Sequence, residues 1–398
     1  MKITLIGDIM CEPCVLDGAR EKDGSYNFDT LYSKVKPLFD ESDYVIGNIE
    51  FPLAGEEAKY TDSYYVFNAP DEFARATKRA GIDMVSTINN HTLDRGPEGM
   101  YRTIKVLDEI GLPHTGSFLP EKGREEAAYF EIDGVKIALV AYTYTTNKRV
   151  NPDDEFAPYM NCLVPYDCPI YLPYIRKKMN SWVERVFKKV PSEKRSVIRK
   201  WVGLPNAIAR SDDYIDFDAY EPYQEKFMAD IREAKKKADF VIAYPHVGGQ
   251  FENEPGARTK YSVYNATKAG ADAVIASHSH TLQRAYFKGD VPCAYSLGNF
   301  SMSCKSSIVW KKAHPEYGIA IHLYLDGAKL EKVTFSILEA VQNRGESMIS
   351  WPVDELYASL KSKKKKKKLI ENVKWAYKIV TGKDIEGEVI RREYELEA

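Results

Sequence analysis

The chain of 398 residues has a formal net charge of −2, and 44% of its residues are hydrophobic. This composition excludes general disorder, and the near-zero charge gives no reason to expect a nucleic-acid partner. No apolar run is long enough to cross a membrane, and the short run that ends at Ile6 cannot form the core of a signal peptide. We therefore expect a cytoplasmic protein.

Short strand-like runs alternate with segments of helical period along most of the chain. The predicted strands span residues 2–6, 43–49, 83–88, 135–142, 240–244, 273–276 and 293–297. The predicted helices span residues 28–39, 70–80, 97–110, 222–238 and 256–269, and proline or glycine marks several of these boundaries. The alternation predicts an α/β fold, and Asp-Gly turns at 133–134 and 326–327 predict hairpins that make the sheet mixed.

Two segments depart from this alternation. Residues 147–220 are rich in Pro, Tyr, Trp and basic residues, and are too long for an ordinary connection. They form either a small inserted helical or irregular subdomain or a lid, and their aromatic side chains serve either as stacking faces for a sugar or polymer or as the core of the segment itself. Residues 336–398 are charged and helical. The lysines from Lys361 to Lys368 are a solvated helix or linker in one interpretation and contact anionic lipid or polymer in the other.

Polar residues with metal-ligand chemistry gather where the predicted strands end. The residues at these positions are Asp8, Asn48, Glu50, Asn89, Asn90, His91, His246, His278 and His280. In α/β sheets, ligand sites form outside the carboxyl ends of strands, so the coincidence has a structural cause. Each residue alone has an ordinary explanation as a cap, a turn or a hydrogen-bonded side chain. Together, carboxylates, an amide and imidazoles predict a site for Zn²⁺, Mn²⁺ or Fe.

The stretch Ala276-Ser277-His278-Ser279-His280 places two histidines one residue apart after a strand. Both imidazoles can turn toward one centre if the backbone leaves the extended conformation there. Two imidazoles at one centre repel each other when both are protonated, and a metal ion removes this conflict because it binds them in the neutral form.

Six motifs in chain order resemble those of the bacterial capsule synthesis protein CapA family, also called the poly-γ-glutamate capsule biosynthesis (PGA_cap) family, which is similar to the calcineurin-like metallophosphoesterases. They are GDIM at 7–10, GNIEFPL at 47–53, NNHTLDRG at 89–96, HVGG at 246–249, SHSH at 277–280 and SLGNF at 296–300. The resemblance covers about residues 1–325, except for the 147–220 segment. It implies a four-layer α/β/β/α metallophosphoesterase-like sandwich over residues 1–335, followed by the charged helical extension of residues 336–398.

The resemblance also implies roles for single residues. The implied metal ligands are Asp8, Glu50, Asn90, His246, His278 and His280. His91 falls on the position of the general acid, and Asp94 either orients it or caps the helix that begins near Pro97. The chain departs from the superfamily pattern at Met10, where a histidine is usual, and at the bridging aspartate, for which Glu50 is the candidate and Asn48 its rival. We therefore expect one firmly held metal and a second that is weak or missing.

The implied activity is that of a metal-dependent, phosphoesterase-like hydrolase associated with capsular polysaccharide or poly-γ-glutamate biosynthesis. Its substrate would be a small phosphoester or a capsule polymer or precursor. Water activated by the metal would attack phosphorus, and His91 would protonate the leaving group. One alternative is a binding or assembly module of a polymer synthase, peripheral to the inner face of the membrane through the lysine run. Another is an amidase that acts on polyglutamate.

Overall fold

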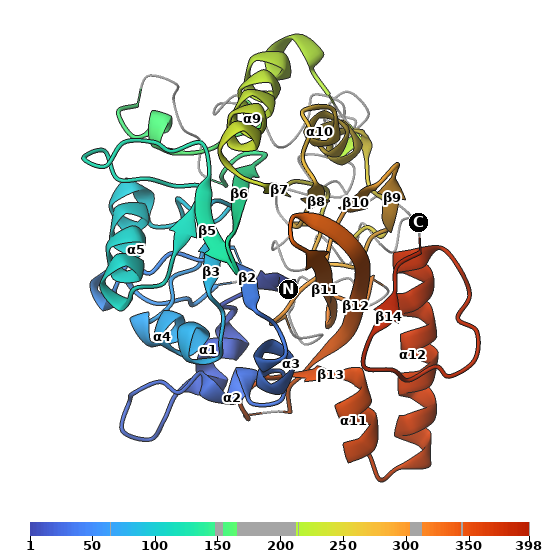
Figure 1. Cartoon of the computed structure of the whole chain (residues 1–398). Helices are drawn as coiled ribbons and strands as arrows, with labels where there is room; N and C mark the ends of the chain where they lie inside the picture. The colour runs from blue at the N-terminus through green and yellow to red at the C-terminus, as the bar shows by residue number, and fades with distance from the viewer. Residues whose placement is uncertain are drawn as a thin grey trace, which may run out of the picture.

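The computed structural model describes residues 1–63, 65–147, 154–164, 212–213, 215–302, 313–343 and 345–397. Two β-sheets pack face to face, and helices cover their outer faces (Figure 1). The predicted four-layer α/β/β/α architecture is confirmed. Most of the 147–220 segment, including the aromatic residues from Tyr166 to Trp201, lies outside the described residues. Within the described parts, no helix combines the length and the apolar character that crossing a bilayer requires.

The first sheet has the strand order β13-β12-β11-β1-β2-β3-β4, and β14 pairs with β12. Its strands are β1 (Lys2–Ile9), β2 (Tyr44–Ile49), β3 (Met84–Ser86), β4 (His114–Thr115), β11 (Tyr317–Asp326), β12 (Lys329–Val341), β13 (Ile349–Pro352) and β14 (Tyr394–Glu395). The helices of this half are α1 (Pro13–Ala19), α2 (Asp29–Tyr32), α3 (Lys36–Asp40), α4 (Asp71–Arg79), α5 (Gly96–Ile110), α11 (Val353–Ser359) and α12 (Lys363–Thr381). Strands β1, β2, β3 and β4 run parallel, so their carboxyl ends lie at one edge.

The second sheet has the strand order β5-β6-β7-β8-β10-β9. Its strands are β5 (Ala128–Ile132), β6 (Val135–Thr143), β7 (Phe240–His246), β8 (Ala273–Ile275), β9 (Ala285–Lys288) and β10 (Val291–Ala294). Helices α9 (Phe217–Lys237) and α10 (Ala257–Lys268) cover its outer face. Strands β6, β7, β8 and β10 are parallel, which again places several carboxyl ends side by side.

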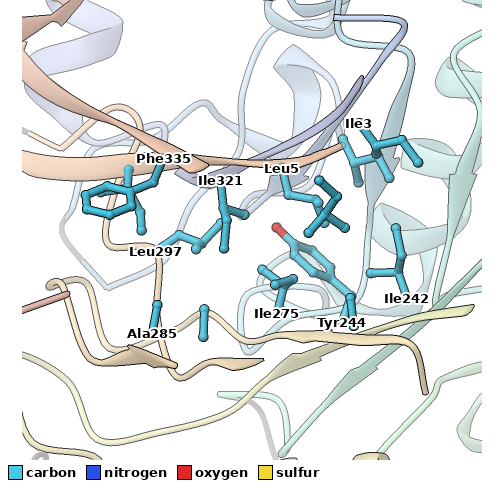
Figure 2. Packing of buried hydrophobic residues seen from close by; sticks show 14 of the residues in the cluster. Ile3, Leu5, Ile242, Tyr244, Ile275, Ala285, Leu297, Ile321 and Phe335 are labelled. Atoms are coloured by element: carbon cyan, nitrogen blue, oxygen red, sulfur yellow. The ribbon is translucent and has the colours of Figure 1, made fainter. Parts of the chain in front are cut away.

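Apolar clusters lie between each sheet and its outer helices, and a further cluster lies between the two sheets. Ile3 and Leu5 on β1 face Ile242 and Tyr244 on β7 across this layer (Figure 2), and the Tyr244 hydroxyl donates a hydrogen bond to the carbonyl of Ile6 (3.2 Å). The alternate residues of β1 face the helices on the other side. β1 is therefore buried on both faces, and each large apolar side chain removed from water stabilises the fold by roughly 1.5–3 kcal/mol.

Both predicted hairpins form, but the second turns at residues 327–328, one position later than predicted, because Asp326 still pairs with Lys329. Asp133 and Gly134 have φ angles of 51° and 79°, as a primed two-residue turn requires. Helix α9 begins at Phe217, earlier than the predicted start at Pro222, because Asp216 caps it by accepting a hydrogen bond from the Ala219 N–H (3.2 Å). Strand β12 crosses residue 335, where the sequence predicts the main domain to end, and the following strands continue the first sheet.

His322 lies in a buried polar ladder across three strands of the first sheet. Its Nδ1 lies 2.7 Å from the Thr4 hydroxyl of β1, and its Nε2 lies 3.0 Å from the Ser336 hydroxyl of β12. Burial, with a smaller contribution from the charge of Lys2, lowers the pKa of His322 to about 3. His322 is therefore neutral in the folded protein at physiological pH.

This ladder predicts a specific loss of stability in acid. An unfolded histidine binds a proton below about pH 6.5, whereas folded His322 does so only near pH 3. Between these values the unfolded state binds one more proton, so the free energy of unfolding falls with decreasing pH by about 1.4 kcal/mol per unit. His322→Gln should show a shallower slope than wild type in urea unfolding between pH 4.5 and 5.5. Equal slopes would contradict the account.

Candidate metal centre

The carboxyl ends of five strands meet at one point between the two sheets. Six side chains gather there, each no more than 2% exposed: Asp8 in the last two residues of β1, Glu50 after β2, Asn90 after β3, His246 at the end of β7, and His278 and His280 after β8. All six are predicted ligand positions, and the structure brings all of them together. Their ligand atoms form two groups that share Glu50.

The first group contains Glu50, His246 and His278, whose ligand atoms lie within 4.8 Å of one another. His246 Nε2 is 3.0 Å from His278 Nδ1 and 3.5 Å from Glu50 Oε1. Asn90 joins this group because its Oδ1 is 2.7 Å from His246 Nε2 and 3.0 Å from His278 Nδ1. Two imidazoles, an amide oxygen and a carboxylate thus face one point.

The second group contains Asp8, Glu50 and His280. His280 Nδ1 lies 2.9 Å from Asn299 Oδ1, an acceptor that favours the tautomer with the proton on Nδ1. The Nε2 of His280 lies 3.5 Å from Glu50 Oε1. A bare Nε2 is the form in which an imidazole binds a metal. Met10 packs instead among the helices of the first sheet, so within the described residues this group offers three potential ligands.

The backbone departs from the extended conformation at both histidines after β8. His278 has a φ angle of 101° and His280 one of 54°, values that cost a residue with a side chain of order 1–3 kcal/mol. The His278 N–H donates to Asp8 Oδ2 (3.1 Å), which ties the strained loop to the other sheet. This geometry turns both imidazoles inward, although they are separated by a single residue.

Close contact between two backbone segments sets the position of Asp8. A Cβ atom at Gly7 would lie 2.3 Å from the Gly298 carbonyl oxygen, so only glycine fits there. The contact lets the Asp8 N–H donate to the Gly298 carbonyl (3.1 Å) and the Asp8 carbonyl accept from the Phe300 N–H (2.8 Å). The motifs at 7–10 and 296–300 thus meet in space and fix Asp8.

The charged forms of these buried groups are disfavoured. Burial, and next the charge of Glu50, raise the pKa of Asp8 to about 6. Burial also raises the pKa of Glu50, lowers that of His246 to about 4 and lowers that of His278 well below its usual range. A divalent cation would offset the penalty on the carboxylates, and it would bind the imidazoles in the neutral form that burial already favours.

Glu50 gives the sharpest test of whether a cation fits. Among the described residues, no nitrogen or hydroxyl donates a hydrogen bond to its fully buried carboxylate, and its side-chain partner is the carboxyl group of Asp8. Its nearest nitrogen neighbours are His246 and His280 at 3.5 Å and His91 at 3.9 Å from Oε1. A buried carboxylate is normally paired, hydrogen-bonded or bound to metal. The donor set of the two groups therefore fits a divalent metal.

His91 lies beside the cluster without joining either group. Its Nδ1 is 2.6 Å from Asp94 Oδ2, and the same oxygen accepts the backbone N–H of Phe67 (2.6 Å). The Phe67 ring packs against the imidazole, with centroids 4.3 Å apart. Burial acts to lower the pKa of His91, but its contacts with Asp94, together with the charges of Glu50 and Asp8, outweigh this, and the pKa is raised. The Nε2 of His91 is left facing Glu50.

Comparison with known proteins places the chain in a family. The sequence model of the family described as "Bacterial capsule synthesis protein PGA_cap" matches residues 2–303. The chain belongs to this family.

Two PGA_cap relatives carry descriptive names. "PGA biosynthesis protein CapA" of Bacillus subtilis (strain 168) is 24% identical over 388 residues, which are 96% of this chain and 81% of the relative. "Capsule biosynthesis protein CapA" of Bacillus anthracis is 26% identical, over 75% of this chain and 59% of the relative.

Two solved structures also match this PGA_cap chain. A hypothetical protein from Thermus thermophilus is 14% identical with a TM-score of 0.41, over 85% of this chain and 99% of its own. A putative 5'-nucleotidase from Staphylococcus aureus, in complex with alpha-ketoglutarate, is 11% identical with a TM-score of 0.43, over 94% of this chain and 59% of its own.

Several supporting residues of this PGA_cap centre were not assigned from the sequence. Asn48, the rival to Glu50, donates from Nδ2 to Asp8 Oδ1 (2.8 Å), and Asn89 donates to Asn48 Oδ1 (3.1 Å). Ser277 Oγ lies 2.9 Å from His246 Nδ1. Asn147 contacts Asn90 and His91. The motifs contain most of these residues. Only the distances in the structure distinguish residues that hydrogen-bond to a predicted ligand from the predicted ligands themselves.

Substitution of Glu50 should separate burial of charge from metal binding. Metal-free Glu50→Gln should unfold at the same temperature as wild type or higher, because an unpaired buried charge is removed. Mn²⁺ or Zn²⁺ at 100 times its Kd should stabilise wild type by about 2.7 kcal/mol and the variant much less. Thermal unfolding with and without metal measures both effects.

Glu339→Gln is the matched control, because Glu339 is a partly buried carboxylate that accepts the Tyr317 hydroxyl hydrogen bond (2.6 Å) away from the cluster. This variant should keep the full response to metal. An equal response in wild type and Glu50→Gln would contradict a centre built around Glu50.

Proposed function

We propose that this PGA_cap protein is a metal-dependent hydrolase of phosphoesters that acts in the biosynthesis of a capsule polymer. The observation that carries the proposal is His91, a buried imidazole held by Asp94 at 2.6 Å and directed at Glu50 without belonging to a ligand group. A metal site that only stabilises the fold has no use for such a group. A hydrolase needs it to protonate the leaving oxygen.

Asp8, Glu50, Asn90, His246, His278 and His280 would hold the metal, which is Mn, Zn or Fe. When bound, the cation supplies Lewis acidity and activates water for attack on phosphorus. Glu50 would contribute to both positions, and the first group would hold its ion more firmly because it has one more ligand than the second.

His91 would act as the general acid through Nε2. Asp94 accepts a hydrogen bond from the His91 Nδ1–H and so fixes the ring in one orientation. The contact with Phe67 fixes the plane of the ring. The pKa of His91 is raised by Asp94 and by the charges of Glu50 and Asp8, which favours the protonated form that a general acid needs. Because Asp94 also accepts the Phe67 N–H, its carboxylate cannot rotate freely away from the histidine.

The substrate class follows from the family rather than from the cluster. Relatives named for capsule and PGA biosynthesis support a polymer or one of its precursors as the substrate. A small phosphoester is the form that the cluster would process. We further propose that association with a synthase or an anionic surface would use the lysines at the start of α12, most of which are exposed.

The proposal is tested by assaying metal-loaded protein on p-nitrophenyl phosphate, its diester analogue and polyglutamate. Hydrolysis of a phosphoester that stops with chelator and returns with Mn²⁺ or Zn²⁺ is the expected result. Cleavage of polyglutamate without hydrolysis of either phosphoester would show that the protein is an amidase and not a phosphoesterase. Bound metal without activity on any of them would leave a binding or assembly module.

Substitution of His91 tests the general-acid role directly. With alkyl phosphoesters, whose leaving groups need a proton, His91→Ala should lower kcat by about 10²–10⁴-fold. With p-nitrophenyl esters the loss should be much smaller, because that leaving group departs as an anion. Equal losses on both substrates, or loss of bound metal in the variant, would show that His91 acts otherwise.

A further inference from the structure

Asn147 is an exposed residue that touches two members of the metal centre. It lies four positions beyond the end of β6, at the start of the 147–220 segment. Its backbone N–H donates to the Asn90 carbonyl (2.7 Å), and its side-chain Oδ1 accepts from Asn90 Nδ2 (3.3 Å). Its own Nδ2 lies 3.3 Å from His91 Nδ1 and 3.5 Å from His91 Nε2. Asn90 and His91 are buried, so Asn147 contacts them from the solvent side.

The contact with Asn90 decides which way that amide faces. An asparagine binds a metal through Oδ1, and a flipped amide would present Nδ2, which carries two protons and cannot bind. Asn90 Oδ1 faces His246 and His278, whereas its Nδ2 faces the Asn147 oxygen. An acceptor on the solvent side thus stabilises the orientation that a metal requires.

The contact with His91 adds a second constraint. Asp94 is bound at Nδ1, and Phe67 packs against the ring. The Asn147 Nδ2 lies against the ring edge between the two nitrogens, at 3.3 Å from Nδ1 and 3.5 Å from Nε2, and so limits movement of the ring toward solvent by packing. One side chain therefore bridges the predicted amide ligand and the predicted general acid.

We propose that Asn147 is a positioning residue of the metal centre: it holds Asn90 with its oxygen toward the ion and restrains His91 beside it. The inference rests on the proposed function for the presence of the ion. It requires only that the metal binds, not that a particular substrate is cleaved. Outer-shell partners of metal ligands typically contribute 10–100-fold to metal affinity.

Calorimetric titration of the metal-free protein with Mn²⁺ alone is the direct test. Asn147→Ala should bind Mn²⁺ about 10–100-fold more weakly than wild type, with the same unfolding temperature in the metal-free state. Asn147→Asp keeps an acceptor for Asn90 Nδ2. It should therefore retain Mn²⁺ affinity, and a loss as large as that of Asn147→Ala would show that this acceptor does not hold Asn90.

Asn27→Ala is the matched control, because Asn27 is exposed and its Oδ1 accepts only the nearby Asp29 N–H in the described part of the chain (3.0 Å). It should match wild type in both measurements. If wild type binds Mn²⁺ and Asn147→Ala binds it with the same affinity, the inference about Asn147 is wrong, while the proposed metal centre stands. If wild type binds neither Mn²⁺ nor Zn²⁺, the proposed metal centre fails and this inference fails with it.

Discussion

The centre depends on how the charge of the buried Glu50 carboxylate is balanced. This carboxylate lies between two groups of potential ligands, and three imidazole nitrogens surround one of its oxygens within 3.9 Å. A charge at this depth is costly unless something of opposite charge is present. His246 does not supply that charge, because burial lowers its pKa to about 4. His91 is held 2.6 Å from the Asp94 carboxylate, whereas its nearest approach to Glu50 is 3.9 Å. The site is thus unfavourable when empty, as expected of a site arranged for a cation.

The fold creates this point because both sheets contribute the carboxyl ends of parallel strands to it. The parallel order β1-β2-β3 supplies the acids and the amide, and β7-β8 supplies the imidazoles. The apolar layer in Figure 2 fixes the position of one sheet against the other. This rigid layer also tolerates the positive φ angles of His278 and His280, since such strain persists only where the surroundings over-determine it.

The sequence predicted what depends on local pattern. Strand ends, both Asp-Gly hairpins and the six clustered polar positions follow from periodicity and from the rule that sites form at carboxyl ends. The sequence named Glu50 as the candidate for the bridging acid but left Asn48 as its rival, because both lie at the end of β2. The neighbouring strand β1 decides between them, because Asp8 pairs with Asn48 and accepts a hydrogen bond from its amide. The start of α9 and the contact of Asn147 with Asn90 likewise depend on neighbours that are distant in sequence.

The two ligand groups differ in chemistry as well as in number. The group of His246, His278, Asn90 and Glu50 is rich in nitrogen, whereas that of Asp8, Glu50 and His280 is rich in carboxylate oxygen. Nitrogen ligands suit Zn and Fe, and carboxylates suit harder ions such as Mn. Two cations that share Glu50 would also repel each other, so the less well furnished position would fill second. We therefore attribute the expected inequality of the two positions to ligand count and charge together, since Met10 stands where the resemblance implies a histidine.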